Sequence, residues 1–200
     1  QIKSNNVTVE LDNPTEYAQS YTFGKSIPNL WVAVGFGSTH TIATSLDGII
    51  WTGRGTTIFS SGGFGIAWNG SLWVAVGRGT THTIATSPDG INWTGRGTTI
   101  FSSYGVGIAW NGSIGAVTIQ QPIIAMGTAN TTHSIAYSSN NGLSWSGLGT
   151  TLFSTQGNGV VWNGNLWVGL GEGTNTIAYS YDGTHWTGLG SDIFTSYGNR

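Results

Sequence analysis

The chain has 200 residues and a formal net charge of −2 at pH 7, and only 7% of its residues are charged, far fewer than the quarter that is usual in soluble domains. Six scattered Lys and Arg residues give no basic surface, and no apolar run is long enough to cross a bilayer, so neither nucleic-acid binding nor membrane insertion is expected. The lack of Cys excludes disulfides and thiolate metal sites, while 38% hydrophobic residues are ample for the core of one domain.

Residues 1–16 precede the repeated part of the chain. Val7 to Leu11 alternates like a strand, and Asp12-Asn13-Pro14 ends it. We expect this strand to pair with the edge of a sheet and to join the two ends of the fold. The chain begins with Gln1 instead of Met, so we also expect a processed, mature form.

The first repeat spans residues 17–60, and the second, residues 61–102, shows the pattern most clearly. A strand ending at Trp68 is followed by Asn69-Gly70, a strong hairpin signal, and by a second strand over residues 72–76. A third strand over residues 83–86 and the turn Ser87-Pro88-Asp89-Gly90 lead into a fourth strand. No window has helical spacing of its apolar residues, so each repeat is predicted to be a four-stranded antiparallel sheet.

The third repeat spans residues 103–154, with an insertion at 113–122, and the fourth spans residues 155–200. Equivalent Trp residues at 51, 93, 145 and 186 lie 42, 52 and 41 residues apart. A period of about 42 residues and four strands is typical of a propeller blade. The sequence therefore predicts an all-β chain, a β-propeller with four repeats, as a closed four-bladed ring or as part of a larger propeller. We expect the closed single-chain ring, with nearly all ten Trp residues packed between blades.

The four turns that end in these Trp residues resemble the Asp-box, Ser-x-Asp-x-Gly-x-x-Trp. Residues 45–51, 87–93 and 180–186 are one residue shorter than the motif, and residues 138–145 have its full length with Asn140 in place of Asp. Asp-box (BNR-like) propeller repeats occur in sialidase-like hydrolases, in receptors, and in secreted and virus-encoded repeat proteins. The resemblance implies a buried Trp and a purely structural role for the acidic or amide side chain, which caps backbone N–H groups of its own turn. These side chains are Asp47, Asp89, Asn140 and Asp182.

The acidic and basic residues do not suggest an enzyme. Sialidase-like catalysis needs an arginine cluster, a nucleophile pair and a free acid, but Arg54 and Arg96 occupy equivalent places in different blades, so they are not expected to converge. A glycosidase with paired carboxylates is also unsupported, because three of the eight acidic residues belong to box turns. We expect no catalytic activity and no cofactor.

The connections that precede the third strands carry the candidate binding residues. Equivalent polar side chains recur there and would lie on one face of a ring: His40, Arg78, His82, His133 and Asn175. Separate blades would keep the imidazoles apart, so a metal site is not expected. Two readings stay open, namely solvated turn residues and repeated weak sites for neutral sugars.

The leading hypothesis is a non-enzymatic, lectin-like module that binds glycans through several weak sites. The alternative is a structural or assembly protein that contacts another protein or itself, for instance through the insertion at 113–122. The uncharged, Thr-rich composition favours an extracellular or virion-surface location.

Overall fold

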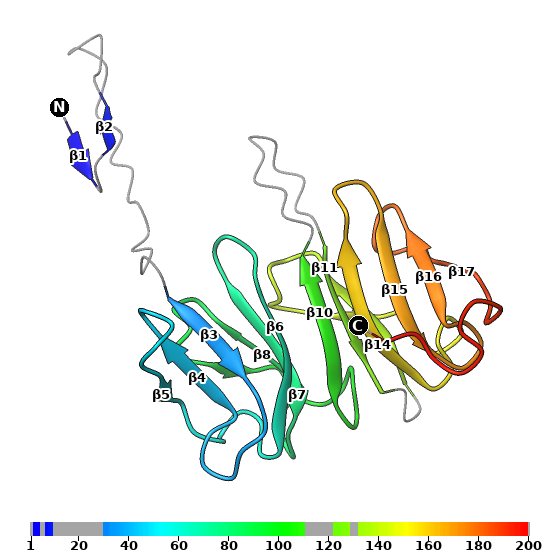
Figure 1. Cartoon of the computed structure of the whole chain (residues 1–200), viewed down its shortest axis with the longest axis horizontal. Helices are drawn as coiled ribbons and strands as arrows, with labels where there is room; N and C mark the ends of the chain where they lie inside the picture. The colour runs from blue at the N-terminus through cyan, green and yellow to red at the C-terminus, as the bar shows by residue number, and fades with distance from the viewer. Residues whose placement is uncertain (1, 5–6, 10–29, 111–121, 129–131, 200) are drawn as a thin grey trace.

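The computed structural model describes residues 2–4, 7–9, 30–110, 122–128 and 132–199, and all regular structure in these residues is β (Figure 1). An N-terminal hairpin precedes four antiparallel sheets. The hairpin consists of β1 (Ile2–Ser4) and β2 (Val7–Val9). The first sheet contains β3 (Trp31–Val34), β4 (Ile42–Ser45) and β5 (Thr52–Gly53); the second contains β6 (Gly62–Trp68), β7 (Trp73–Arg78), β8 (Ile84–Ser87) and β9 (Thr94–Gly95); the third contains β10 (Gly105–Trp110), β11 (Ile123–Gly127), β12 (Ile135–Ser138) and β13 (Ser146–Gly147); the fourth contains β14 (Gln156–Trp162), β15 (Trp167–Glu172), β16 (Ile177–Ser180) and β17 (Thr187–Gly188).

Each sheet is an antiparallel meander in which strands follow one another in chain order. In the second sheet, Trp68 pairs with Trp73 across the Asn69-Gly70 turn, where Gly70 has a φ of 92°. The Asn69 side chain accepts the backbone N–H of Leu72 at 2.7 Å, which fixes the turn. The predicted four-stranded units are thus confirmed for the second, third and fourth repeats. The first sheet has three described strands. The start of the first repeat, residues 17–29, and nearly all of the insertion at 113–122 lie outside the described residues.

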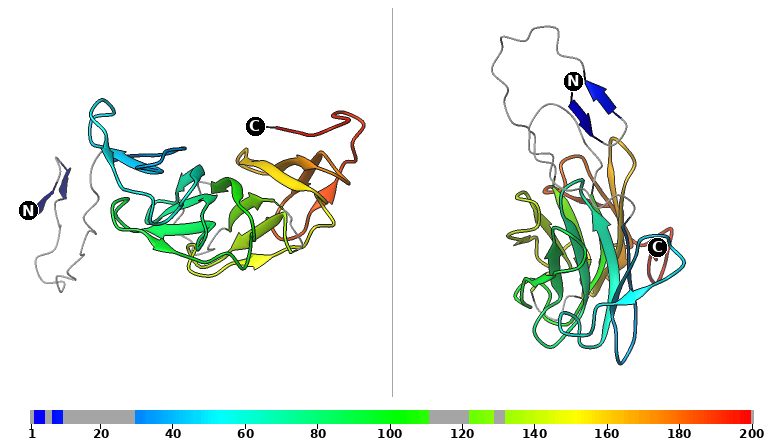
Figure 2. Two further views of the ribbon diagram at one scale, coloured as in Figure 1. Left: turned by 90° about the horizontal axis from the view of Figure 1, so that it is seen from below. Right: turned by 90° about the vertical axis from the view of Figure 1, so that its left-hand side faces the viewer.

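The four sheets lie one after another along an open arc (Figure 2). The first strands of the second, third and fourth sheets, β6, β10 and β14, pack against one another. Glycine permits this close approach, because a Cβ atom at Gly107 would lie 3.1 Å from the Cα atom of Gly159 in the next sheet. The first and fourth sheets therefore lie at opposite ends of the arc.

The described residues do not close into the single-chain ring expected from the sequence, because the first and fourth sheets lie at opposite ends of the arc (Figure 2). The expected closing strand also has a different partner. Val7–Val9 pairs with Ile2–Ser4 in a local hairpin instead of with the edge of a sheet. A hairpin of adjacent residues needs only a short loop, whereas pairing with a distant sheet edge requires a much longer one.

The core is divided into three clusters, one at each interface between consecutive sheets. Each cluster contains a Phe from the connection that leads into the next sheet. Phe59, Phe101 and Phe153 are all completely buried at these interfaces. The sheets are therefore held together face to face, each by its immediate neighbours.

The expectation that nearly all Trp residues pack between blades is confirmed in part. Five of them are partly buried against the clusters at the interfaces, namely Trp93, Trp110, Trp145, Trp162 and Trp186. All ten lie in the described part of the chain, but one alone, Trp167, is fully buried. Trp31 is 58% exposed and Trp51 43% exposed. Indole rings are large and carry a polar N–H, so they suit the partly solvated rim of an interface, while the smaller Phe rings fill its centre.

No helix in the described residues is long and apolar enough to cross a membrane.

Candidate binding grooves between neighbouring sheets

The turn between the third and fourth strands of every sheet is closed by its own side chains. Asp89 Oδ1 accepts the backbone N–H groups of Ile91 at 2.9 Å and Asn92 at 2.7 Å. Trp93 donates its Nε1–H to the Gly90 carbonyl at 3.0 Å. Corresponding bonds form at Asp47, Asn140 and Asp182. Each box therefore stabilises its own turn, and its bonded oxygen is not available to a ligand.

These bonds favour the ionised carboxylates. Burial would raise the pKa of Asp89, but hydrogen bonds from Asn92, Ile91 and Ser87 outweigh it and hold this pKa at about 2, against an ordinary 3.8. At Asp182 burial is likewise outweighed, by bonds from His185 and Thr184, and the pKa is lowered. Backbone N–H groups of Ile50 and Ile49 lower the pKa of Asp47.

We expect acid to destabilise the fold through these turns. A lowered folded-state pKa gives stability that is complete above the unfolded-state value of 3.8 and is lost as pH falls towards about 2. Replacing all three carboxylates by Asn, in the variant D47N/D89N/D182N, removes this titration and keeps the acceptor oxygen. The melting temperature of the wild-type chain should fall steeply over this window, and that of the variant should fall much less.

The third sheet supplies the natural precedent for this variant, because Asn140 Oδ1 accepts the Ser144 N–H at 2.9 Å. Differential scanning calorimetry at three pH values across the window makes the comparison. Equal losses in both proteins would show that the box turns do not carry the acid sensitivity.

The candidate residues of the third-strand connections do not converge on one site, because each one is bonded within its own sheet or to its neighbour. The Nδ1 atoms of His40, His82 and His133 accept the backbone N–H groups of Gly55, Gly97 and Gly149 at 2.9–3.0 Å, and Asn175 Oδ1 accepts that of Gly190 at 2.9 Å. The four glycines all have positive φ, in the loop after the fourth strand. These side chains therefore hold that loop, and an acceptor role for Nδ1 places the ring proton of each His on Nε2.

This role could have been found in the sequence. The Gly that donates its N–H lies 15 or 16 residues after the polar residue in all four repeats. Arg78, the fifth candidate, is exposed, and its guanidinium lies 5.9 Å from the centre of the Tyr104 ring in the third sheet. It is not part of a cluster with the other four.

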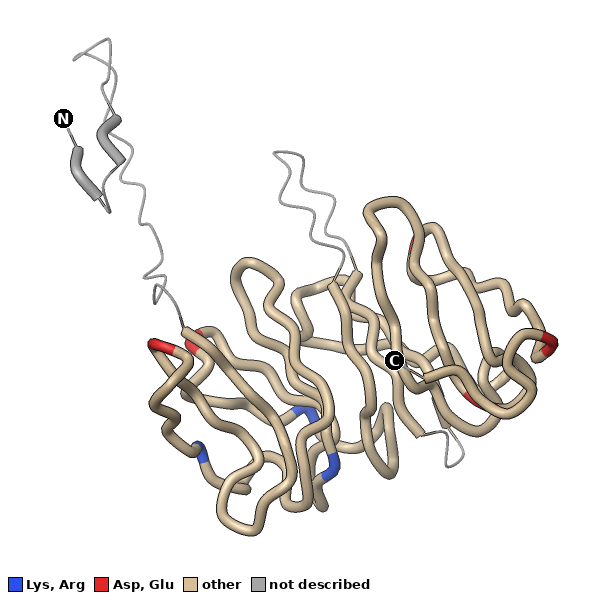
Figure 3. Tube along the Cα trace, in the orientation of Figure 1, with Lys and Arg blue, Asp and Glu red and all other residues tan. Residues whose placement is uncertain are grey.

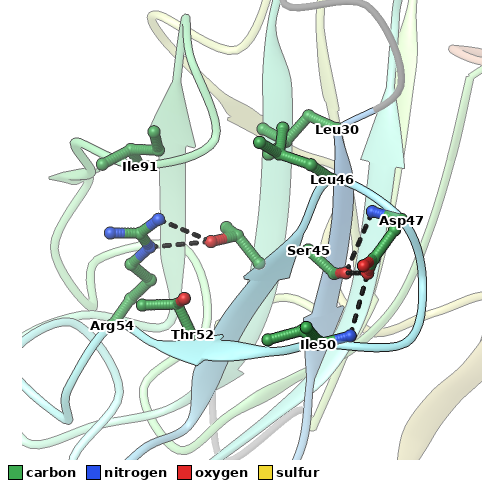
Figure 4. A pocket seen from close by; sticks show the side chains of 9 residues that line it. Leu30, Ser45, Leu46, Asp47, Ile50, Thr52, Arg54 and Ile91 are labelled. Atoms are coloured by element: carbon green, nitrogen blue, oxygen red, sulfur yellow. Dashed lines mark hydrogen bonds between the residues drawn. The ribbon is translucent and has the colours of Figure 1, made fainter.

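A cavity of about 400 Å³ opens between the first and second sheets, and sequence analysis did not identify it (Figure 4). Arg54 lies on one side and donates from Nε and Nη2 to the Thr44 hydroxyl at 2.9 and 2.6 Å. Asp47 lies on the other side, with Oδ1 bonded in its turn and Oδ2 free of hydrogen bonds from the described residues. Leu30 and Ile91 contribute apolar walls. The groove thus presents fixed donors and an acceptor beside an aliphatic surface.

A second cavity, of about 340 Å³, lies between the third and fourth sheets. It is lined by Leu148, Asn175 and Trp186, among others, so one of the sequence candidates does border a groove. At the positions of Thr44 and Arg54 the second sheet has the bonded pair Thr86 and Arg96. The equivalent pairs in the third and fourth sheets are Tyr137 with Leu148 and Tyr179 with Leu189. The first two sheets therefore carry Thr and Arg at these two positions, and the last two carry Tyr and Leu.

No three His, Asp or Glu side chains come together to hold a metal ion in the part of the chain that the structure describes. Comparison of the chain with protein-family models and with curated proteins gives no match. The resemblance to Asp-box repeats therefore rests on the four turns alone.

Proposed function

We propose that this chain is a non-enzymatic, lectin-like module of the Asp-box propeller type, which binds small neutral carbohydrates in the grooves between neighbouring sheets. The observation that carries the proposal is the Arg54 groove. Two bonds to Thr44 hold the guanidinium in place, so its remaining N–H donors are oriented before a ligand arrives. Sugar hydroxyls match these donors and the free oxygen of Asp47, and the C–H faces of a sugar ring match Leu30 and Ile91.

The electrostatics support binding without catalysis. A general acid works best when its pKa lies near the working pH. The pKa values of the three box carboxylates are lowered, to about 2 at Asp89, so these groups stay ionised at neutral pH. Charged residues are few along the described chain, which suits an uncharged ligand and an extracellular or virion-surface setting (Figure 3).

Repetition supports the same proposal. Grooves lie between two pairs of neighbouring sheets, and Asn175 lines one of them. Weak sites on one rigid arc bind a branched or polymeric glycan together with much higher avidity than one site alone. The His40 and His133 side chains contribute by fixing the loops that follow Arg54 and Leu148 at these grooves.

The test is a groove exchange that copies another sheet of the same chain. The variant T44Y/R54L gives the first groove the Tyr and Leu side chains that the third sheet has naturally. A glycan array identifies a ligand of the wild-type chain, and titration calorimetry then compares its affinity in the two proteins. We expect a loss of about 10-fold or more at the first groove, because hydrogen bonds to a charged group are lost.

The matched control is Arg78→Leu, which removes one positive charge outside the groove and should leave the affinity unchanged. An unchanged affinity in T44Y/R54L would exclude the first groove as a site. Loss of binding in the control instead would place the ligand on the loop face, and no glycan bound by the wild-type chain would overturn the proposal as a whole.

The second candidate function is assembly, and a different observation favours it. Large apolar side chains are exposed at both ends of the arc, among them Trp31, Ile50, Ile193 and Phe194. Apolar surface at the two ends of a repeat array indicates an interaction surface.

A further inference from the structure

Each interface between consecutive sheets contains a Phe that sits on a Gly of the next sheet. The pairs are Phe59 with Gly77, Phe101 with Gly127 and Phe153 with Gly171. A Cβ atom on these three glycines would lie 2.8, 2.6 and 2.5 Å, respectively, from Cγ of the Phe. Such distances are shorter than any carbon–carbon contact, so only Gly can take the ring. The same Phe-on-Gly contact thus occurs at all three interfaces.

A second contact runs in the opposite direction across each interface. The Gly of each box turn lies against the second strand of the preceding sheet, or the residue just before it. A Cβ atom at Gly90 would lie 2.5 Å from Leu30 and 3.0 Å from Val32. Equivalent contacts join Gly142 to Val74 and Gly183 to Ile124. Each interface therefore contains two contacts. In one, a Phe packs on a Gly of the next sheet, and in the other, the box-turn Gly of that next sheet packs on the preceding one.

At each end of the arc, one partner of the Phe-on-Gly contact and one partner of the box-turn contact have no counterpart in the described chain. Phe194 is equivalent to the three completely buried Phe residues, but it is 43% exposed. Gly35 is equivalent to the three glycines that receive a Phe, and a Cβ atom there would have no neighbour within 4 Å among the described residues. The box glycine of the first sheet, Gly48, lies near Trp31 and near no other described residue. Leu166 and Val168, which match Leu30 and Val32, are half-buried on the last sheet.

We propose that two copies of this chain dock head to tail, with the fourth sheet of one copy against the first sheet of the other. Phe194 sits on Gly35 of the second copy, and the Ser45–Trp51 turn of that copy sits on Leu166 and Val168. This interface repeats the chemistry of the three that the chain already contains, and it covers the exposed ring of Trp31. It does not depend on carbohydrate binding.

The occupant is a second copy because the same chain cannot supply it in this structure. Its first and fourth sheets lie at opposite ends of the arc (Figure 2), and Gly35 follows β3 of the first sheet whereas Phe194 follows β17 of the fourth. A contact between different surfaces on two copies closes into a ring when the rotation allows it. The curvature of the arc favours such a ring, with two identical interfaces.

Charge favours the same orientation. In the described residues the fourth repeat carries Glu172, Asp182 and Asp192 and no Lys or Arg, whereas on the first sheet the charge of Asp47 is balanced by that of Arg54 (Figure 3). Docking two fourth sheets together would bring like charges close and cost free energy. Docking a fourth sheet on a first sheet avoids this repulsion.

Engineered cysteines test the contact directly, because the chain has none of its own. The single variants Phe194→Cys and Gly35→Cys are oxidised separately and as a mixture. We expect a disulfide-linked pair of unequal variants in the mixture, with much less linkage in either variant alone. A double variant that carries both cysteines and links only within one chain would overturn the proposal.

The interior pair Phe59→Cys with Gly77→Cys, placed in one chain, is the matched reference for disulfide geometry.

A second measurement does not depend on disulfide formation. Sedimentation should give a mass of two chains for the wild-type protein and of one chain for both Phe194→Ala and Gly35→Val. Gly35→Val should still fold, because the position is open in the single chain. A monomeric wild-type protein, or a dimer that survives both substitutions, would exclude head-to-tail docking.

Discussion

Phe101→Ala should lower the free energy of unfolding by about 3–5 kcal/mol, the range found when a large buried aromatic ring is removed. Phe101 is completely buried between the second and third sheets, in one cluster with Val76, Ile84 and Ile123. The cavity left behind cannot collapse easily, because each of these side chains is fixed by a strand. Urea unfolding followed by tryptophan fluorescence measures the change.

Phe194→Ala is the matched control, since the same residue type at the same repeat position is 43% exposed. Both substitutions are best compared in the Gly35→Val background, so that association of copies does not add to the measured stability. We expect a loss below about 1 kcal/mol for Phe194→Ala there. Similar losses at the two positions would mean that burial between sheets is not what stabilises the fold.

Gly95→Ala should destabilise the second sheet by about 1–3 kcal/mol, the usual cost of overpacking. The new methyl group would overlap the His82 ring, which lies directly against Gly95. The ring cannot move away without losing the hydrogen bond from the Gly97 N–H at 3.0 Å. Chemical denaturation of the single variant gives the size of the loss.

A double-mutant cycle shows whether the clash is the cause. Removing the ring in His82→Ala relieves the overlap, so the double variant should be more stable than the sum of the two single losses predicts, by at least 0.5 kcal/mol or so. The cycle is measured in the Gly35→Val background, so that association of copies does not add to the measured stabilities. Additive losses in the cycle would contradict the proposed contact.

Local features of the fold could be predicted from the sequence because they depend on neighbouring residues. Asn69-Gly70 specifies a hairpin by its backbone preference, and that hairpin is present. Repeats in the sequence likewise gave the strand order within each sheet. In both cases the information lies within a few residues or recurs at a fixed spacing.

Features that depend on the packing of one sheet on another could not be predicted in the same way. Burial was assigned to the Trp residues by their size, whereas the interfaces bury Phe at their centres. The Arg54 groove needs two sheets to form it, so no pattern within one repeat reveals it.

The arrangement of the core also bears on how such a chain changes over evolutionary time. Every hydrophobic cluster draws its residues from two consecutive sheets and none from a third. Residues 55–61 and 97–103 have the same sequence, Gly-Thr-Thr-Ile-Phe-Ser-Ser, and contain the Phe of an interface. Unequal recombination between two such stretches adds or removes a whole sheet and leaves an intact interface at the new junction. The number of repeats in such a chain can thus change in one step, and no new core has to evolve.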